Sequence, residues 1–434
     1  MKKLLFFLFF LLFGANANYN AEEFFLKNGL RVVLIERKSV PIIECSIWFR
    51  CGSKCDALLK SGCAHFLEHL ACENHKKKFS DYLYNIGAET NAFTSVNTIC
   101  FHEIFPKECL EKVLSFESER IRSLEIEDKV FQNEKKAVLE ERGMRTDSDI
   151  LGKCYEVFLA NVFNRLVGGI SVIGWKHEIE SISVEDLKDY YKTWIVPNNA
   201  IIVLVGDFDK EEVKQLIKKY FEDIPAAELP KKISSPQKID CKKSIELRST
   251  QKGGSTVEYV YKVPFLYKNN LRKAWALTLA LEVLEQPSSF VNGILKHMTD
   301  AVHSFRFSYY ALFYEYDILS VSFSMNAIDN WDKIGTHWSY FKKKILNGCI
   351  SEEALQKIKK RERIALAYKK EDIDRISTYF GYNLVLRFSL KDISSVDDLI
   401  QSITVKECND VLKEVFSTSP ISVMKTLPKG YDRD

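Results

Sequence analysis

The stretch "SGCAHFLEHL", from Ser61 to Leu70, places two histidines and a glutamate within five residues of a chain that contains only eight histidines. Its apolar residues recur at helical spacing, so the stretch is predicted to form a helix. Positions i and i+4 of a helix lie on one face, about one turn apart. His65 and His69 can therefore direct two imidazole nitrogens at one point in space, and Glu68 leans toward the same side.

This order of residues, His-x-x-Glu-His, is the inverse of the commoner zinc-protease pattern. Two neutral imidazoles suit zinc, and a catalytic zinc site needs one further protein ligand and an open position for water. A nearby carboxylate can accept the proton of that water as it attacks a carbonyl. Without a third ligand, a chance arrangement on an amphipathic helix remains an equal alternative.

A downstream helix, "NEKKAVLEERGMR", supplies three candidates for the third ligand: Glu134, Glu140 and Glu141. Glu134 and Glu141 are seven residues apart, nearly two full turns, so they share a face, whereas Glu140 is rotated by about 100° from Glu141. If that face meets the histidine helix, Glu141 becomes the third ligand and Glu134 orients a ligand imidazole. The alternative is an ordinary charged face in contact with solvent.

Around these helices, strand-like and helix-like segments alternate. The segments "GLRVVLIE" and "PIIECSIWFRC" are rich in Val and Ile and predict two neighbouring strands. "ETNAFTSVNTICFHEIF" predicts a strand pair or one long strand, and "NNAIIVLVGDF" predicts a buried strand followed by a helix. We therefore expect an α+β fold, with a mixed, largely antiparallel sheet and helices packed on one face.

The segment "IPAAELPKKISSPQKIDCKK" has three prolines and no periodicity, which is typical of a linker. A linker at residues 225–243 divides the chain into an N-terminal domain, 18–224, and a C-terminal domain, 244–434. Near the ends of these halves lie "ISVEDLKDYYK" and "ITVKECNDVLK", each with a predicted helix N-cap and each followed by a β-like run. Unrelated capped helices can look alike, but their matching positions favour two duplicated domains.

Residues 1–17, "MKKLLFFLFFLLFGANA", carry two lysines, an apolar run and a small-x-small end. This pattern is typical of a signal peptide cut after Ala17. The apolar run is about half of the roughly 20 residues needed to span a bilayer. The alternative is an uncleaved anchor. We expect an exported protein with no integral membrane segment after cleavage, periplasmic if its source is a Gram-negative bacterium.

The charge and the cysteine content narrow the possible partners and environments. The net charge is +3, with acidic and basic residues interspersed, which argues against a nucleic-acid partner. The eleven cysteines are an odd number. Export would permit disulfides, but buried reduced thiols are the favoured interpretation.

Several motifs carry a resemblance to a known family. "HFLEH", "NAFTS", "EKKAVLEERGMR", "VIGWKHEI" and "PNNAIIVLVGDF" follow one another as in the pitrilysin/insulinase-like zinc peptidases. The chain looks most similar to their bacterial members, which resemble the subunits of the mitochondrial processing peptidase. The resemblance covers nearly the whole mature chain, is strong from Gly29 to Pro225 and weakens afterwards.

The resemblance implies a role for each residue of the predicted centre. One Zn²⁺ per chain is held by His65, His69 and Glu141, with Glu134 in a supporting position and Glu68 as the general base. The family fold implies that the chain forms half of a closable clamshell chamber, which admits peptides or unfolded segments.

The same resemblance places "NAFTS" on a sheet edge beside the metal. Substrate backbone would pair there as an added strand along Asn91, Ala92 and Phe93. Edge-strand addition recognises extended peptide through main-chain hydrogen bonds and leaves the choice of side chains to pockets. Taken alone, the segment predicts only a turn that enters a strand.

The second half departs from the family pattern. Self-sufficient members carry an arginine and a tyrosine there that bind the substrate carbonyl, and the matching positions here hold Lys296 and His303. Arg306 with Tyr309 or Tyr310 could substitute only if the alignment slips by several residues. The resemblance therefore favours the zinc-bearing subunit of a heterodimer, with a homodimer as the alternative.

The sequence thus predicts an exported zinc metalloendopeptidase that uses a zinc-activated water and a glutamate general base. Two alternatives from other classes stay open. One is a catalytically silent structural subunit, and the other is a chamber that binds peptides without cutting them.

Overall fold

The computed structural model of the chain describes residues 19–74, 76–148, 150–162, 171–230, 243–248, 255–264, 267–289, 291, 302–311, 317–325 and 331–427. The predicted signal peptide, 1–17, and most of the predicted linker, 225–243, lie outside this description. Among the described residues, no helix combines the length and the apolar character needed to cross a membrane.

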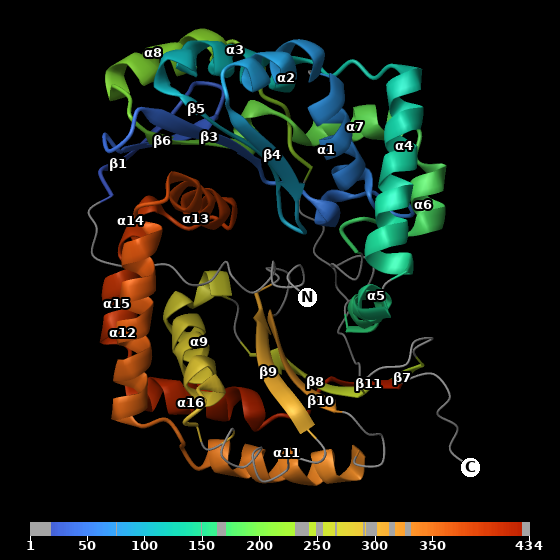
Figure 1. Cartoon of the computed structure of the whole chain (residues 1–434), viewed down its shortest axis with the longest axis vertical. Helices are drawn as coiled ribbons and strands as arrows, with labels where there is room; N and C mark the ends of the chain where they lie inside the picture. The colour runs from blue at the N-terminus through green and yellow to red at the C-terminus, as the bar shows by residue number, and fades with distance from the viewer. Residues whose placement is uncertain are drawn as a thin grey trace.

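The first half of the chain is built on a six-stranded mixed sheet (Figure 1). Its strands are β1 (Ala21–Phe25), β2 (Arg31–Glu36), β3 (Ile42–Phe49), β4 (Glu89–Thr94), β5 (Ile99–Pro106) and β6 (Ala200–Gly206). They lie in the order β1-β2-β6-β3-β5-β4, with β2 and β6 parallel and the other neighbours antiparallel.

The prediction that β2 and β3 are neighbours in the sheet is wrong, because β6 lies between them. All seven residues of β6, "AIIVLVG", are buried. A strand that is apolar on both faces is most stable inside a sheet, where both faces are covered, so β6 takes the central position.

Helices cover one face of this sheet. They are α1 (Cys63–Asn74), α2 (Lys76–Asn85), α3 (Leu110–Arg122), α4 (Asp128–Arg142), α6 (Lys176–Ser181), α7 (Val184–Trp194) and α8 (Lys210–Phe221). Helix α5 (Ile150–Val162) instead reaches the second half, where Cys154 contacts Thr426. Alternate residues of β3, among them Ile43, Cys45 and Ile47, point into a core shared with the helices that cover the sheet. The other face of β3 therefore carries Glu44, Ser46 and Trp48.

The second half repeats the sheet. Its strands are β7 (Lys243–Arg248), β8 (Ser255–Val263), β9 (Val302–Tyr310), β10 (Asp317–Met325) and β11 (Ser422–Leu427). They lie in the order β7-β11-β8-β10-β9, with β7 and β11 parallel and the rest antiparallel. Strands β2-β6-β3-β5-β4 have the same order and directions, so the predicted α+β fold with two duplicated halves is confirmed.

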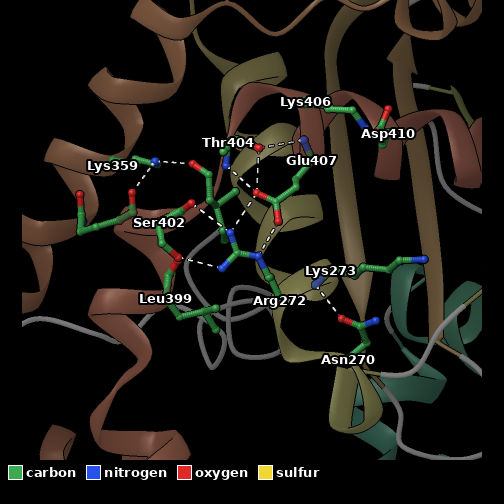
Figure 2. Close-up of polar contacts among 12 residues, drawn as sticks. Asn270, Arg272, Lys273, Lys359, Leu399, Ser402, Thr404, Lys406, Glu407 and Asp410 are labelled. Carbon is green, nitrogen blue, oxygen red and sulfur yellow. Dashed lines mark hydrogen bonds and ion pairs between the residues drawn. The ribbon is translucent and has the colours of Figure 1, made fainter.

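The helices of the second half are α9 (Leu271–Glu285), α11 (Trp331–Leu346), α12 (Glu352–Lys369), α13 (Ile373–Val385), α14 (Leu390–Ser394), α15 (Val396–Ser402) and α16 (Val405–Phe416). Helix α16 is the counterpart of α7, and each precedes the last strand of its half. Ser183 caps α7 and Thr404 caps α16, both in a capping box, as the sequence predicts. At α16, Glu407, the acidic partner of Thr404 in the capping box, also accepts hydrogen bonds from Arg272 of α9 (Figure 2).

None of the ten cysteines that the structure describes forms a disulfide. Six of them are buried: Cys45, Cys51, Cys63, Cys100, Cys154 and Cys408. For the described cysteines, the interpretation as mostly buried reduced thiols is confirmed.

Helix α13 joins the two halves by packing on the face of the first sheet opposite its own helices (Figure 1). Ser377 of α13 lies with its hydroxyl 2.6 Å from that of Ser46, which in turn accepts a hydrogen bond of 2.8 Å from the Trp48 indole. The backbone of α13 approaches this indole closely at Gly381. A Cβ atom on Gly381 would lie 2.1 Å from Trp48 Cε2, so only glycine fits there.

Gly381→Ala is therefore expected to destabilise the protein by about 1–3 kcal/mol, the usual result of overpacking a well-filled core. The measurement is the urea midpoint of unfolding of the variant against the parent chain. Gly335→Ala in α11 is the matched control, because a Cβ atom there meets only the Tyr259 hydroxyl, at 3.9 Å. The control is expected to be neutral or slightly stabilising, since alanine favours helix over glycine. Equal midpoints for both variants would contradict this account of the α13 contact.

Candidate metal centre

Helix α1 begins inside the protein, where its first amide groups are held by a half-buried carboxylate. Asp56 accepts hydrogen bonds of 2.8 Å from the backbone N–H groups of Gly62 and Ala64. Burial raises the pKa of Asp56 to about 8, against the effect of these two bonds. Gly62 has a φ of +94°, and a Cβ atom there would lie 2.7 Å from the carbonyl oxygen of Ile173. The start of α1 is thus fixed by the backbone around it.

Helix α4 packs along α1 through a short apolar contact. The rings of Phe66 and Phe131 stack with their centroids 5.2 Å apart, and Val138 is fully buried two turns further along α4. This orientation turns Glu134 and Glu141 toward α1 and leaves Glu140 exposed. The helical spacing predicts the same division between the three glutamates.

Three side chains converge between the two helices. The Oε2 atom of Glu141 lies 3.5 Å from Nε2 of His65 and 3.4 Å from Nε2 of His69. The imidazole rings are 4.8 Å apart and nearly perpendicular, at 71°. Each residue therefore offers one ligand atom within 4.8 Å of the other two.

This arrangement fits a zinc ion. Ligand atoms about 2.0–2.2 Å from a tetrahedral zinc lie roughly 3.3–3.6 Å from one another, close to the two distances above. The Oε2 atom of Glu141 is buried and has no hydrogen-bond partner among the described residues. A buried carboxylate oxygen without a partner is costly unless an ion compensates it, so the donor set suits a cation.

Two further residues hold the ligands in place. The Oε2 atom of Glu134 lies 3.1 Å from Nδ1 of His69, so that Nε2 of the same ring is turned toward Glu141. Arg145 forms an ion pair of 2.6 Å with the other carboxylate oxygen of Glu141. Such outer partners fix the tautomer and orientation of ligand imidazoles.

The charge states of the ligands follow from their surroundings. Burial lowers the pKa of His65 to about 4, which keeps this imidazole neutral and free to bind a metal. Burial also acts to lower the pKa of His69, but the carboxylates of Glu141 and Glu134 outweigh it and raise that pKa. The pKa of Glu141 is lowered, because His69, His65 and Arg145 outweigh the effect of its burial.

Glu68 lies on α1 with His65 and His69, but its surroundings differ from theirs. Burial raises its pKa to about 7, although a short hydrogen bond from the Thr94 hydroxyl opposes this shift. The charges of His69 and Glu141 also act on this carboxyl group. A carboxylate with a pKa near neutrality is well suited to accept and return a proton.

The predicted substrate-binding residues Asn91, Ala92 and Phe93 lie on β4, at the edge of the first sheet. Among the described strands, β4 pairs with β5 alone, and its C-terminal residue, Thr94, contacts Glu68. Asn91 is exposed, Ala92 is half-buried, and the Phe93 ring packs against Trp48, with the centroids 5.5 Å apart. An edge strand beside the candidate centre is the arrangement that strand addition requires.

The predicted positions of the second half stay predictions. Lys296 lies outside the described residues, and His303 lies on β9, the edge strand of the second sheet. Tyr309 is buried and donates a hydrogen bond of 2.7 Å to Asp317, and Arg306 is exposed. The hydroxyl of Tyr309 therefore already has a structural partner.

Three residues that support the centre escaped the sequence analysis: Asp56, Thr94 and Arg145. Arg145 stands four residues after Glu141, a helical spacing that signals an ion pair. Thr94 belongs to the quoted motif "NAFTS", but nothing local indicates that its hydroxyl meets Glu68. Asp56 stands in an irregular loop, and the sequence gives no sign of its role.

Two family descriptions match the chain. "Insulinase (Peptidase family M16)" matches residues 31–156, which contain the candidate ligands, and "Peptidase M16 inactive domain" matches residues 181–362. The first match therefore lies in the half with the histidines, and the second lies mostly in the other half.

Individual proteins show the same similarity. The zinc protease PqqE of Helicobacter pylori is 30% identical over 260 residues, 58% of each chain, and the beta subunit of the mitochondrial-processing peptidase of Lentinula edodes is 26% identical over 47% of this chain and 45% of its own. The chain thus spans about half the length of these curated relatives. The crystal structure of a protease from Helicobacter pylori superposes with a TM-score of 0.83, 24% identity and coverage of 94% of this chain and 99% of that one.

Replacing a candidate ligand by alanine is expected to remove about one equivalent of zinc per chain. This holds for His65→Ala, His69→Ala and Glu141→Ala, because a three-ligand site rarely survives the loss of one ligand. The measurement is the metal content of the purified protein after dialysis. Glu140→Ala is the control, since Glu140 is exposed on the same helix. If Glu140→Ala lost zinc and Glu141→Ala kept it, the assignment of the ligand face would be wrong.

Proposed function

Because the chain belongs to the insulinase-like M16 family of peptidases, we propose that it is a zinc-dependent endopeptidase. In this proposal His65, His69 and Glu141 hold the metal, and Glu68 is the general base. The observation that carries it is the convergence of two imidazole nitrogens on one buried carboxylate oxygen that lacks a hydrogen-bond partner.

A zinc ion at this place would polarise the scissile carbonyl and lower the pKa of a water molecule. The protein supplies the remaining chemistry. Glu68 accepts the proton of the attacking water and returns it to the leaving amine, and its raised pKa suits both transfers. Thr94 holds the Glu68 carboxyl group through its hydrogen bond, which fixes where the proton is received.

The proposed substrate is a peptide or an unfolded polypeptide segment. An extended segment can add to the free edge of β4 through backbone hydrogen bonds along Asn91, Ala92 and Phe93. This geometry brings the substrate backbone past Thr94 toward Glu68. Folded proteins present few extended segments, so they would be poor substrates. The signal-like residues 1–17 support an exported protein.

A second candidate function is a silent subunit that binds peptides or supports a partner without hydrolysis. What favours it is the family resemblance, which implies that Lys296 and His303 stand in the second half where self-sufficient relatives have an arginine and a tyrosine. The full set of Glu68 and three ligands favours the enzyme, because a subunit without activity has no need for all four.

The two observations are compatible if the chain is the zinc-bearing subunit of a heterodimer. Loss of one donor to the developing oxyanion costs about 10²–10³ in rate, and a homologous subunit could supply it. Lysine and histidine offer neither the planar fork of arginine nor the phenol of tyrosine. A homodimer is the alternative assembly.

Glu68→Gln is expected to keep its zinc and to lose hydrolysis of a quenched unstructured peptide, because an amide cannot accept the proton. Zinc content and turnover should be measured on the same sample. Glu140→Gln serves as the control, since it makes the same chemical change on an exposed residue. A Glu68→Gln protein with undiminished turnover would exclude Glu68 as the base, and inactivity of the zinc-loaded parent chain in every assembly would favour the silent subunit.

The isolated chain is expected to bind zinc and to cleave the unstructured peptide slowly, with a gain of about 10²–10³ when a homologous subunit with the Arg/Tyr pair is added. The comparison is turnover per zinc, with and without that subunit. Full turnover by the chain alone, with no gain on addition, would contradict the heterodimer.

A further inference from the structure

A second group of metal-ligating side chains lies between the two halves, away from the candidate centre. Glu44 of β3, His102 of β5 and Asp374 of α13 each offer one ligand atom within 4.8 Å of the other two. Nδ1 of His102 lies 3.5 Å from Oδ1 of Asp374. The group therefore contains one imidazole and two carboxylates, contributed by both halves.

Strand pairing explains how the group forms. In β3, Glu44 and Ser46 point to the sheet face that α13 covers, and His102 pairs with Ser46 across the neighbouring strand. Asp374 stands in the first turn of α13, three residues before Ser377, which contacts Ser46. The candidate zinc centre belongs to α1 and α4, which cover the opposite face. The two groups are thus separated by the sheet.

Glu44 is the residue that calls for a partner. It is 1% exposed, and its Oε2 atom has no hydrogen-bond partner among the described residues. Ser377 donates a hydrogen bond to the carboxyl group, but no lysine or arginine of the described residues forms an ion pair with it. Oδ1 of Asp374 is likewise buried and without a hydrogen bond. Burying such oxygens is costly unless a cation binds them.

The residues beside Glu44 in the sheet are apolar, so they give no structural reason for a carboxyl group at this position. The residues that pair with Glu44 on the two neighbouring strands are Ile104 of β5 and Val205 of β6, and both belong to or pack against an apolar core. An apolar side chain would fill the Glu44 position without the cost of an unpaired carboxyl oxygen. Burial also lowers the pKa of His102, which leaves its imidazole in the neutral form that binds metals.

We propose that Glu44, His102 and Asp374 bind a second divalent transition-metal ion, with zinc as the best fit, that links the first sheet to α13. Zinc binds both imidazole nitrogen and carboxylate oxygen and takes four ligands, so one imidazole, two carboxylates and a water can complete its coordination. The side chain of Asp374 is 42% exposed, so the ion can enter from solvent. The ion would be structural and would add to the one zinc expected at the α1–α4 centre.

The test uses the full-length mature chain with both histidines of the first centre replaced, His65→Ala/His69→Ala. This double variant is expected to bind about one Zn²⁺ per chain in a zinc titration. Adding Asp374→Asn or Glu44→Gln to it is expected to lower its zinc affinity by more than about 10–100-fold. Glu89→Gln is the matched control, because Glu89 is an exposed carboxylate on the adjacent strand β4 and outside the group.

Thermal unfolding of the same proteins provides the second measurement. Zn²⁺ is expected to raise the melting temperature of the double variant and of its Glu89→Gln derivative, but not that of the Asp374→Asn derivative, because only a native site stabilises the fold. Circular dichroism without metal identifies any variant that fails to fold. If one of Asp374→Asn and Glu44→Gln does not fold, the other one decides whether the zinc site exists. Absence of zinc binding by the double variant, or equal binding by all derivatives, would overturn the proposal. Neither result bears on activity at the first centre.

Discussion

The contact between α1 and α4 is the interaction on which the candidate zinc centre depends. Phe66 stacks on Phe131, and Val138 is buried between this contact and Glu141, so the rotation of α4 about its own axis is fixed by apolar packing. A rotation of α4 by one residue, about 100°, would replace Glu141 by Glu140 or Arg142. Apolar residues that do not bind the metal therefore decide which side chains of α4 face it.

The position of α1 depends in turn on polar groups that are buried or half-buried. Asp56 holds the first amides of α1, and Arg142, at the end of α4, is buried and forms a bidentate ion pair with Glu156 at 2.8 and 2.9 Å. Buried polar groups of this kind are costly when one partner is removed, so they resist small movements of the helices. Such rigidity suits a site in which three ligand atoms must stay within a few tenths of an ångström of their places.

Much of this arrangement could be predicted from the sequence, because it rests on local periodicity. Helical spacing alone separates Glu134 and Glu141 from Glu140, and the caps Ser183 and Thr404 mark two equivalent helices. The resemblance to the family adds the role of the β4 edge, which no local pattern reveals. The order of strands in the first sheet was predicted less well, since burial of β6 on both faces decides it.

Contacts between distant segments could not be predicted. Nothing in the sequence indicates that α13 covers the first sheet, that Gly381 meets Trp48, or that Asp374 approaches His102. The contacts of Gly381 with Trp48 and of Asp374 with His102 each join residues more than 250 positions apart, through a surface that only exists once both halves are folded. The sheet therefore carries candidate ligand groups on both sides, one encoded in a short motif and one assembled by tertiary structure.

The most direct test of the central claim is an anomalous difference map, measured just above the zinc absorption edge, from crystals of the mature chain purified without added metal. The account predicts a peak about 2.0–2.2 Å from Nε2 of His65, Nε2 of His69 and Oε2 of Glu141 together. A map without a peak between these three atoms, at full zinc content of the protein, would contradict it.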